Sequence, residues 1–248
     1  MAELLDLGRL VIQTPICYKA IKNIAVSEIM NGHGHLELQL VIDDTEPSDI
    51  SRLEQSPIEV FTMDGERVFC GVCIGYHIEQ FCQYQELYIE AVTKSYLADI
   101  EPKSLTFQSE SKTLQSILEQ VLAPYGALLS FEQNPVISQM IYQQNETDWA
   151  FSRRIANQFG LSLFVNAKAN GLQVSVGTIP FSVHHVDTLP DDIVEKNIEV
   201  LRLYQQTTNP QMMAFELERH GGTVADLNLG VGHFLQKDGR VFVIVQSK

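Results

Sequence analysis

The fold is decided first by the stretch Pro57-Ile-Glu-Val-Phe-Thr-Met-Asp-Gly-Glu-Arg-Val-Phe-Cys-Gly-Val-Cys-Ile-Gly75. Two runs rich in β-branched and aromatic residues flank Asp64-Gly65. Asp-Gly between two such runs is the strongest short-range signal for a β-hairpin, because glycine adopts the positive φ that the tight turn requires. The sequence therefore predicts a hairpin centred on Asp64-Gly65.

Three neighbouring segments extend this β pattern. Residues 21–27 and 35–42 flank the turn signal Asn31-Gly-His-Gly34, and the second segment alternates strictly at Leu36, Leu38 and Leu40. This predicts an antiparallel pair around a turn with positive φ. Residues 84–92 add a further strand. Many short, evenly spaced strands predict a β-barrel or sandwich, and a barrel hides its edges by closing on itself.

After Pro102 the pattern becomes helical. Apolar residues recur at helical spacing from Leu114 to Leu122, with Ser111 or Lys112 near the start and Pro124 marking the end. They are Leu114, Ile117, Leu118, Val121 and Leu122.

A second helix is predicted after Asn145, which is a good N-cap, with Glu146 and Asp148 placing negative charge in the first turn. Gly160 supplies a left-handed cap at its C-terminal end. The apolar residues of this helix are predicted to lie on one face. The stripe holds Phe151, Ile155 and Phe159 with Ala156 adjoining, whereas Ser152 and Arg153 face elsewhere. We expect Tyr142, Phe151, Phe159 and Phe164 to lie in the core.

Two alternating strands follow at residues 161–165 and 172–176, joined through Asn170-Gly171. Residues 101–178 are thus predicted to be an α+β unit inserted after the first barrel. Beyond it we expect a polar linker at 183–197, strands near 198–204 and 212–218, and a hairpin at 231–245 around Asp238-Gly239. The echo of Asp64-Gly65 in this last hairpin suggests a second, related barrel.

The charge balance disfavours two classes of partner. The chain has 248 residues, 45% of them hydrophobic, and carries a net charge of −14. Nucleic acids and anionic membranes are bound by clustered Lys and Arg, and Arg153-Arg154 is the densest basic spot. No secretory signal pattern and no apolar run long enough to span a membrane occurs. We therefore expect folding in the cytosol and no membrane anchor.

Some residues resemble chemical sites and have a structural interpretation beside the chemical one. Cys70 and Cys73 have the spacing of half a zinc site, with Cys82 nearby, but residues three apart on a strand face opposite sides. In a reducing compartment all four cysteines, with Cys17, are expected as free, buried thiols. His33 with His35, and His184 with His185, are metal candidates that lack further ligands. Turn and surface histidines are the expected interpretation.

Carboxylate pairs give the only pattern pointing to hydrolysis. They are Asp43-Asp44, Asp191-Asp192 and Glu146 with Asp148. A glycosidase needs two carboxyl groups facing each other across a cleft, whereas loop starts and a helix N-terminus explain these pairs structurally. No phosphate-binding loop, nucleophile elbow or His-Glu-x-x-His motif occurs. The sole tryptophan, Trp149, either anchors the helix in the core or serves as an interface anchor.

The stretch Ile141-Tyr-Gln-Gln-Asn-Glu-Thr-Asp-Trp-Ala-Phe-Ser-Arg-Arg-Ile-Ala-Asn-Gln-Phe-Gly-Leu-Ser-Leu-Phe164 resembles a motif of the VgrG and phage late-control D hub family. Two further motifs match in order, Arg67-Val-Phe-Cys-Gly-Val72 and Ser104-Leu-Thr-Phe-Gln-Ser109. The resemblance covers about residues 20–180. The motif residues form one set of structural and assembly positions. They are Phe69, Gly71, Phe107, Gln108, Tyr142, Gln144, Glu146, Thr147, Asp148, Trp149, Arg153, Arg154 and Gly160.

The resemblance implies a mainly β protein made of a tube-like barrel (1–100), an inserted α+β domain (101–178) and a second barrel (179–248). It implies a homotrimer whose six barrels dock a hexameric inner tube, Hcp-like, while three-fold symmetry suits a spike. No cofactor, metal or catalytic residue is implied. Family hubs usually continue past the hairpin at Asp238-Gly239, so either the spike is a separate chain or the second barrel is incomplete.

The expected function is therefore structural: the hub of a phage tail, type VI secretion device or tailocin-like particle, assembled in the cytoplasm with tube, spike and baseplate proteins. Polar strand positions are candidates for the channel wall or subunit contacts. They are Glu37, Gln39, Glu59, Glu86 and Glu90. Two alternatives stay open at this point, a hub-associated cell-wall hydrolase and a stand-alone β-rich binding module.

Overall fold

The computed structural model describes residues 10–42, 51–54, 56–108 and 112–177. Beyond these it describes the strand residues 184–185, 193–197, 215–219, 234–237, 240–243 and 246–247. In the part so described, no helix combines the length and the apolar character needed to cross a membrane.

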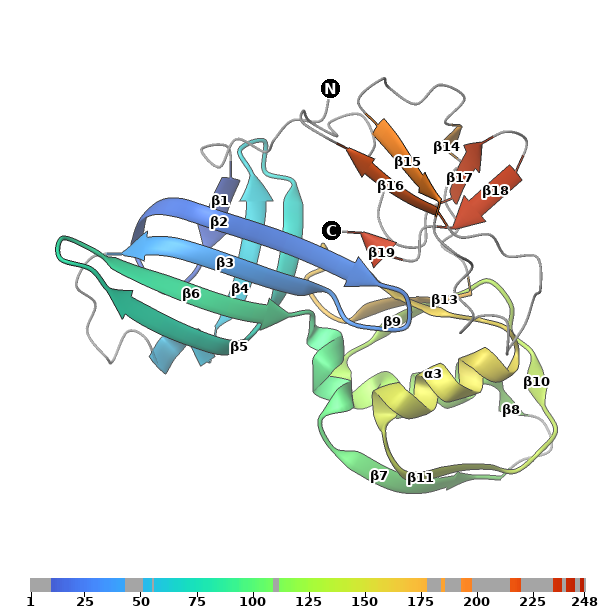
Figure 1. The fold of residues 1–248 in the computed structure, drawn as a ribbon. Coiled ribbons are helices and arrows are strands. Elements are labelled where there is room, and N and C mark those ends of the chain that lie inside the picture. Colours follow the sequence, from blue (N-terminus) through green and yellow to red (C-terminus); the bar gives the residue numbers. More distant parts are fainter. Residues whose placement is uncertain are drawn as a thin grey trace.

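The first structural unit is a curled antiparallel sheet (Figure 1). Its strand order is β1-β4-β5-β6-β3-β2-β19. The strands are β1 (Leu10–Gln13), β2 (Tyr18–Ile29), β3 (His35–Ile42), β4 (Pro57–Thr62), β5 (Arg67–Gln80), β6 (Gln85–Val92) and β19 (Gln246–Ser247). A short 3-10 helix, η2 (Ser51–Glu54), contributes the buried Leu53. This confirms the predicted β-rich first unit.

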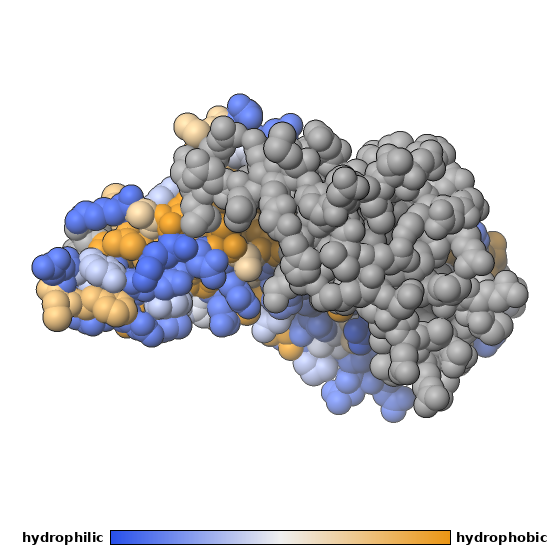
Figure 2. Space-filling view, turned by 45° about the horizontal axis from the view of Figure 1, so that its top comes forward, coloured by the Kyte–Doolittle hydropathy of each residue, from blue (hydrophilic) through white to orange (hydrophobic). Residues whose placement is uncertain are grey.

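Alternation along the strands separates the two faces of this curled sheet. In β3 the residues Leu36, Leu38 and Leu40 are buried, whereas His35 and Glu37 are exposed. Because successive strand side chains point to opposite faces, one face collects the apolar core and the other is mainly polar. Over the curled sheet in Figure 2, hydrophobic residues stay visible between hydrophilic ones, so the outer surface is not uniformly polar.

Both predicted turns of this sheet are confirmed. Gly65 has a φ of 84° between β4 and β5, and the turn is closed by the Gly65 N–H donating to the Thr62 carbonyl at 3.0 Å. Asn31 has a φ of 63° between β2 and β3. Asparagine tolerates this left-handed conformation better than other non-glycine residues, which explains why the turn forms there.

The described strands curl without closing into a barrel. β19 covers only Glu28 and Ile29 of β2, and no described strand pairs with the outer edge of β2 over residues 20–27. The opposite edge strand is β1, whose Ile12 N–H donates to the Tyr18 hydroxyl of β2 at 3.0 Å. The strands β1 and β2 therefore meet at Tyr18 through one hydrogen bond to a side chain and not through backbone pairing between the strands.

The second unit, called the insert here, spans residues 101–177 and follows the 3-10 helix η3 (Lys94–Asp99). It contains two α-helices and several short sheets (Figure 1). The elements are β7 (Pro102–Phe107), β8 (Lys112–Thr113), α2 (Leu114–Leu122), η4 (Ala123–Tyr125), β9 (Leu128–Phe131), β10 (Val136–Ile137), β11 (Ile141–Thr147), α3 (Asp148–Gln158), β12 (Leu163–Val165) and β13 (Gln173–Val176). The predicted α+β unit is confirmed.

The N-cap of α2 differs from the prediction. Thr113 caps the helix, accepting from the Ser116 N–H at 3.2 Å, while its own N–H donates to the Ser116 hydroxyl at 3.1 Å. Lys112, one of the two predicted start residues, lies in β8, and Ser111 lies outside the described residues. The predicted end is confirmed, because Pro124 lies in the 3-10 turn η4 that follows α2.

The start of α3 also lies later than predicted. Thr147 is the N-cap and accepts from the Ala150 N–H at 3.1 Å. Asn145 instead has a φ of 48° in an irregularity of the β11–β7 ladder, and Glu146 belongs to β11. The predicted N-cap was wrong because asparagine, besides capping helices, also tolerates the left-handed conformation that this irregularity requires. Asp148 does lie in the first turn, as predicted.

The end of α3 confirms the predicted role of Gly160. Gly160 has a φ of 70°, its N–H donates to the Asn157 carbonyl at 3.0 Å, and the Leu161 N–H donates to the Ala156 carbonyl at 3.1 Å. This is a Schellman motif, in which a left-handed residue lets two backbone donors satisfy the last helix carbonyls.

The buried face of α3 is only partly the predicted one. Phe151, Ile155 and Ala156 are buried as expected, but Phe159 is 37% exposed. Ser152, predicted to face away, is fully buried and donates from its hydroxyl to the Asp148 carbonyl at 2.7 Å. The prediction failed because this backbone bond satisfies the serine hydroxyl and permits its burial.

The described strands near the C-terminus form small sheets. β14 (His184–His185) pairs in parallel with β17 (Phe234–Lys237), which pairs antiparallel with β18 (Arg240–Val243). β15 (Ile193–Asn197) pairs with β16 (Phe215–Arg219).

The predicted C-terminal hairpin is confirmed in its strands, whereas Asp238-Gly239 and the strand near 198–204 lie outside the described residues. The predicted linker at 183–197 was wrong, since it contains β14 and β15. The mainly β fold class is confirmed.

Candidate assembly site at the junction of sheet and insert

Two of the predicted site residues support the curled sheet. Phe69 is fully buried in its core. Gly71 lies so close to β6 that a Cβ there would fall 2.3 Å from the Val92 carbonyl oxygen and 2.7 Å from the Phe69 ring. Only glycine fits at this position, so this motif serves strand packing.

The second motif leads into the core of the insert. Phe107 is buried at the end of β7 and stacks on Phe151 of α3 with 5.2 Å between the ring centroids. Gln108, which follows it, is exposed. Phe107 thus anchors β7 against α3, and Gln108 is left at the surface.

Asp148 is the buried polar centre of the insert, with 1% of its side chain exposed. Its Oδ2 accepts from Lys103 Nζ at 2.5 Å and from the Tyr125 hydroxyl at 2.7 Å, and its Oδ1 accepts from Gln143 Nε2 at 2.8 Å. The hydrogen bond with Asp148 raises the pKa of Lys103, and burial raises the pKa of Tyr125. This carboxylate joins β7, η4, β11 and α3.

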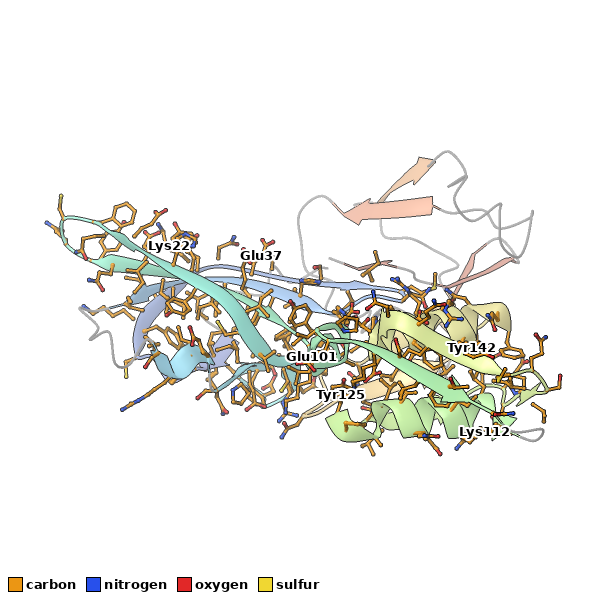
Figure 3. The ribbon with its side chains drawn as sticks, turned by 90° about the horizontal axis from the view of Figure 1, so that it is seen from below. Lys22, Glu37, Glu101, Lys112, Tyr125 and Tyr142 are labelled. Carbon is orange, nitrogen blue, oxygen red and sulfur yellow. The ribbon has the colours of Figure 1, made fainter. Side chains whose placement is uncertain are left out.

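Glu146 and Arg154 form a second, more exposed pair. Arg154 Nε donates to Glu146 Oε2 at 3.1 Å, and Arg154 Nη2 donates to the Tyr142 carbonyl at 2.6 Å. Tyr142 is 50% exposed and lies at the outer surface of the insert (Figure 3). The prediction that Tyr142 lies in the core was therefore wrong. Gln144 and Arg153 are also exposed.

A shallow groove of about 540 Å³ lies over this part of the insert. It is lined by Tyr142, Gln144, Glu146 and Arg154 of the predicted set and by Phe159. The motif residues therefore divide into a buried group, which includes Phe107, Asp148 and Trp149, and a surface group, which includes Tyr142, Gln144 and Arg154.

Trp149 connects α3 to the curled sheet. Its ring is buried, and its indole Nε1 donates to the Asn31 carbonyl at 3.2 Å. Asn31 also donates its N–H to the Leu163 carbonyl at 2.8 Å and accepts the Leu163 N–H on its Oδ1 at 2.8 Å. Of the two interpretations left open, the core anchor is the one observed. We call this contact region, together with η3, the junction.

A chain of hydrogen bonds continues through the junction. His33 Nδ1 lies 2.8 Å from the Ser95 hydroxyl, and His33 Nε2 lies 3.2 Å from Asp99 Oδ2. Thr147, the N-cap of α3, donates its hydroxyl to the other oxygen of Asp99. Ser95 Oγ lies 2.8 Å from Thr93 Oγ1, which accepts the Gly34 N–H at 3.1 Å. The turn of the sheet, η3 and α3 are thereby tied together.

The polar face of the curled sheet holds a second network. Glu86 is buried and pairs with Lys22, and it also accepts from the Gln39 amide at 2.6 Å and the Tyr88 hydroxyl at 3.1 Å. The Lys22 hydrogen bond lowers the pKa of Glu86, and burial raises the pKa of Tyr88 to about 12. Glu86 and Gln39 are therefore engaged within the sheet.

The remaining candidates on this face differ in exposure. Glu37 and Glu90 are exposed and lie directly opposite each other on β3 and β6. No ion pair joins either of them to another residue in the described ranges. Glu37 projects from the outer side of the sheet, as does Lys22 (Figure 3). Glu59 is half-buried, 3.0 Å from Arg67 Nη2.

The cysteines are free thiols, but only some are buried. Cys70 is buried and Cys73 half-buried, and burial raises the pKa of both thiols. Cys17 and Cys82 are exposed, so the expectation of burial was wrong for them. They lie at a chain connection and at the tip of the β5–β6 hairpin, where no apolar layer covers them.

The histidine prediction was also partly wrong. His35 is exposed, but the His33 side chain is only 11% exposed. No cluster of three or more His, Cys, Asp or Glu suited to a metal occurs among the described residues. Asp43-Asp44 and Asp191-Asp192 lie outside the described ranges, as do the side chains of His184 and His185.

Sequence reasoning missed several residues of the junction. Asn31 was assigned only to a turn, and Ser95, Asp99 and Lys103 were not singled out. Asparagine readily adopts a left-handed turn conformation, so the sequence signals the Asn31 turn but not its contacts with Leu163 and Trp149. Ser95 and Asp99 carry no such signal, since their partners lie far along the chain.

The chain is similar to known proteins in its sequence, through a family model, and in its fold, through solved structures. The family model described as phage tail baseplate hub (GPD) matches residues 27–221. No curated protein sequence matches the chain.

Among solved structures, the c3393 protein of E. coli, described as a type VI secretion component similar to the T4 tail proteins gp27 and gp5, superposes with a TM-score of 0.61 at 12% identity, covering 96% of this chain. The 43 kDa tail protein of prophage MuSo2 from Shewanella oneidensis gives 0.56 at 17% identity over 75% of this chain. A tail protein of Neisseria meningitidis gives 0.55 at 14% identity over 92% of this chain. The matches cover 71%, 60% and 70% of those three proteins respectively, and at these identities they show a shared fold.

Proposed function

Because the chain belongs to the phage tail baseplate hub (GPD) family, we propose that three copies of it form a ring that joins a central spike to the hexameric inner tube of a contractile injection machine. In this arrangement residues 1–100 and 179–248 supply two tube-like barrels per copy, and residues 101–178 form a domain inserted between them. Six barrels then match a six-fold tube, while three copies match a three-fold spike. The ring also nucleates tube assembly.

The observation that carries this proposal is the open edge of the curled sheet. β2 has no described strand beside residues 20–27, and an unpaired strand edge is a template for pairing with another chain. β19 already adds to the end of this edge, at Glu28 and Ile29. We infer that barrels of neighbouring copies meet along β2 and β1.

The polar face of the sheet supports its use as a channel wall. Glu37 and Glu90 face each other across β3 and β6, and like charges directly opposite each other destabilise an isolated sheet. A solvated inner wall tolerates this pair, and an acidic surface there repels acidic cargo. The net charge of −14 points in the same direction.

The exposed part of the motif suits contact with neighbouring baseplate proteins. Tyr142 and Gln144 lie at the surface of the insert, and neither is required for its core. Exposed aromatic residues next to an ion pair are typical of interface positions. We assign these side chains to a contact with a partner in the particle.

The proposed role is structural rather than catalytic. The two carboxylates of the motif are occupied, since Asp148 is buried among three donors and Glu146 pairs with Arg154. A buried, fully paired carboxylate is not available to act as general acid or nucleophile. The particle is proposed to assemble in the cytoplasm.

The oligomeric state provides the first test. We expect light scattering to give three times the 27.9 kDa of the single chain. Asn23→Lys places a cation at an exposed position on β2 and is expected to shift the mass toward the monomer, because edge lysines oppose strand pairing. Asn157→Lys makes the same change at an exposed position on α3 and is the matched control.

The second test follows tube assembly. Adding the protein to purified inner tube subunits is expected to shorten the lag of tube polymerisation, with Asn23→Lys less effective than Asn157→Lys. A chain that stays monomeric at high concentration and leaves the lag unchanged would refute the proposed trimeric ring and its role in tube assembly.

A further inference from the structure

The His33 ring lies at the centre of the junction. It follows the Asn31 turn and is enclosed by two aromatic rings, with centroid distances of 5.8 Å to Tyr96 and 5.1 Å to Trp149. Only 11% of its side chain is exposed. The imidazole therefore touches the curled sheet, η3 and α3 at once.

The hydrogen bonds of the neutral ring run in one direction. A carboxylate only accepts, so Nε2 carries the proton and donates to Asp99, which leaves Nδ1 as an acceptor. Ser95 then donates its hydroxyl to Nδ1, and Thr93 donates to Ser95. Thr93 in turn accepts the Gly34 N–H. Every donor in this chain has an acceptor.

We propose that His33 is a proton-binding site that controls the junction: the neutral ring holds the curled sheet and the insert together, and binding of one proton loosens them. The proposal concerns this protein's response to acid and does not depend on the hub assignment.

Protonation reverses the chain at a buried place. An imidazolium donates from both nitrogens, so Ser95 must accept from Nδ1 and can no longer donate its hydrogen to the ring. Either Ser95 still accepts from Thr93 and its own hydrogen lacks an acceptor, or Ser95 donates to Thr93 and the Thr93 hydrogen lacks one, because no other acceptor for either hydroxyl is found among the described residues. Thr93 and Ser95 are both buried, so this unpaired donor destabilises the closed junction.

Some charged groups around the His33 ring favour its protonated form and others oppose it. Asp99 faces Nε2 and favours the imidazolium, whereas His35 on β3 and Arg153 on α3 oppose it, and Tyr96 on η3 packs against the ring. Burial outweighs the Asp99 hydrogen bond and lowers the pKa of His33 below its ordinary 6.5. Because the pKa of His33 is lowered in the closed junction, the neutral ring stabilises the closed junction fully above pH 6.5. This stabilisation decreases as the pH falls from 6.5 toward the lowered pKa.

Trp149 reports on this opening without a label. It is the sole tryptophan, it is buried, and it contacts both His33 and Asn31. The experiment measures acrylamide quenching of its fluorescence in the full chain from about pH 8 to about pH 5, with far-UV circular dichroism to follow secondary structure.

We expect the quenching constant of the wild-type chain to rise about two-fold or more below pH 6.5 while the dichroism stays constant, as local opening predicts. In His33→Gln, whose amide keeps one donor and one acceptor but does not titrate, the rise is expected to disappear. His77→Gln removes an exposed histidine that stacks on Tyr88 and is expected to keep it.

Asp99→Asn gives a variant with the histidine intact. Removing the carboxylate charge is expected to move the midpoint of the rise to lower pH, because the imidazolium loses its favourable partner. The proposal is overturned by a flat wild-type profile, by an unchanged rise in His33→Gln, or by an upward shift in Asp99→Asn. Should His33→Gln not fold, the Asp99→Asn shift decides the question.

Discussion

Asp148→Asn is expected to destabilise the insert far more than Glu146→Gln, although the two carboxylates lie two residues apart in the same motif. Asp148 is 1% exposed and accepts from three side chains, whereas Glu146 is 20% exposed and its partner Arg154 is 41% exposed. The two substitutions remove the same charge from different surroundings.

The magnitude follows from the number of donors left without an acceptor. A hydrogen bond to a charged group contributes about 1.5–3 kcal/mol to stability. Asparagine replaces one carboxylate oxygen by an NH2 group, which then faces the donor of Gln143 or the donors of Lys103 and Tyr125. Lys103 is partly exposed, so solvent screens its share of the loss. We expect a loss of about 3 kcal/mol for Asp148→Asn, and about 0–1 kcal/mol for Glu146→Gln as for other surface pairs.

Urea unfolding followed by Trp149 fluorescence measures this difference, because Trp149 is adjacent to Asp148 in the first turn of α3. With a slope of about 2 kcal/mol per molar urea, a loss of about 3 kcal/mol lowers the midpoint by about 1.5 M. An Asp148→Asn midpoint within about 0.3 M of the wild type would refute the reasoning, as would an equal loss in Glu146→Gln.

Two further predictions concern the curled sheet. Gly71→Ala is expected to destabilise it by about 2 kcal/mol or more in thermal unfolding, because the added Cβ would fall 2.3 Å from a backbone oxygen of β6. Gly75→Ala on the same strand has 3.7 Å of space and is expected to be neutral or stabilising, so equal losses would contradict the packing account. Lys22→Met is expected to flatten the acid dependence of the melting temperature. Because Lys22 lowers the pKa of Glu86, the pair stabilises the fold above pH 4.5, the ordinary pKa of a glutamate, and this stabilisation is lost as the pH falls through the lowered pKa. An unchanged dependence of the melting temperature on pH in Lys22→Met would argue against this account.

Several strands, their turns and the existence of both helices follow from local sequence. The Asp64-Gly65 hairpin, the alternation of Leu36, Leu38 and Leu40 and the left-handed cap at Gly160 were all predictable, because each depends on residues within one turn or one strand. The motif residues were also identifiable, although their division into buried and exposed groups was not.

Errors arose where two local structures compete for the same residue types. Asn145 suits both an N-cap and a bulge, and the pairing of β11 with β7 decided for the bulge, moving the cap to Thr147. Ser152 is polar, yet a bond to the helix backbone allows it to be buried. Strand pairing and packing, rather than intrinsic propensity, settled both positions.

Sequence alone thus determined the hairpin strands of the first sheet and the existence of α2 and α3, because hydrophobic period and turn chemistry act over a few residues, whereas β7, β11, β14 and β15 were not predicted. Only the tertiary structure decided the junction. His33 meets Asp99 across 66 positions and Asn31 meets Trp149 across 118, and such contacts form when separate units pack together. The tilt and burial that bring these groups within hydrogen-bond distance depend on the packing of whole surfaces, which no short pattern encodes.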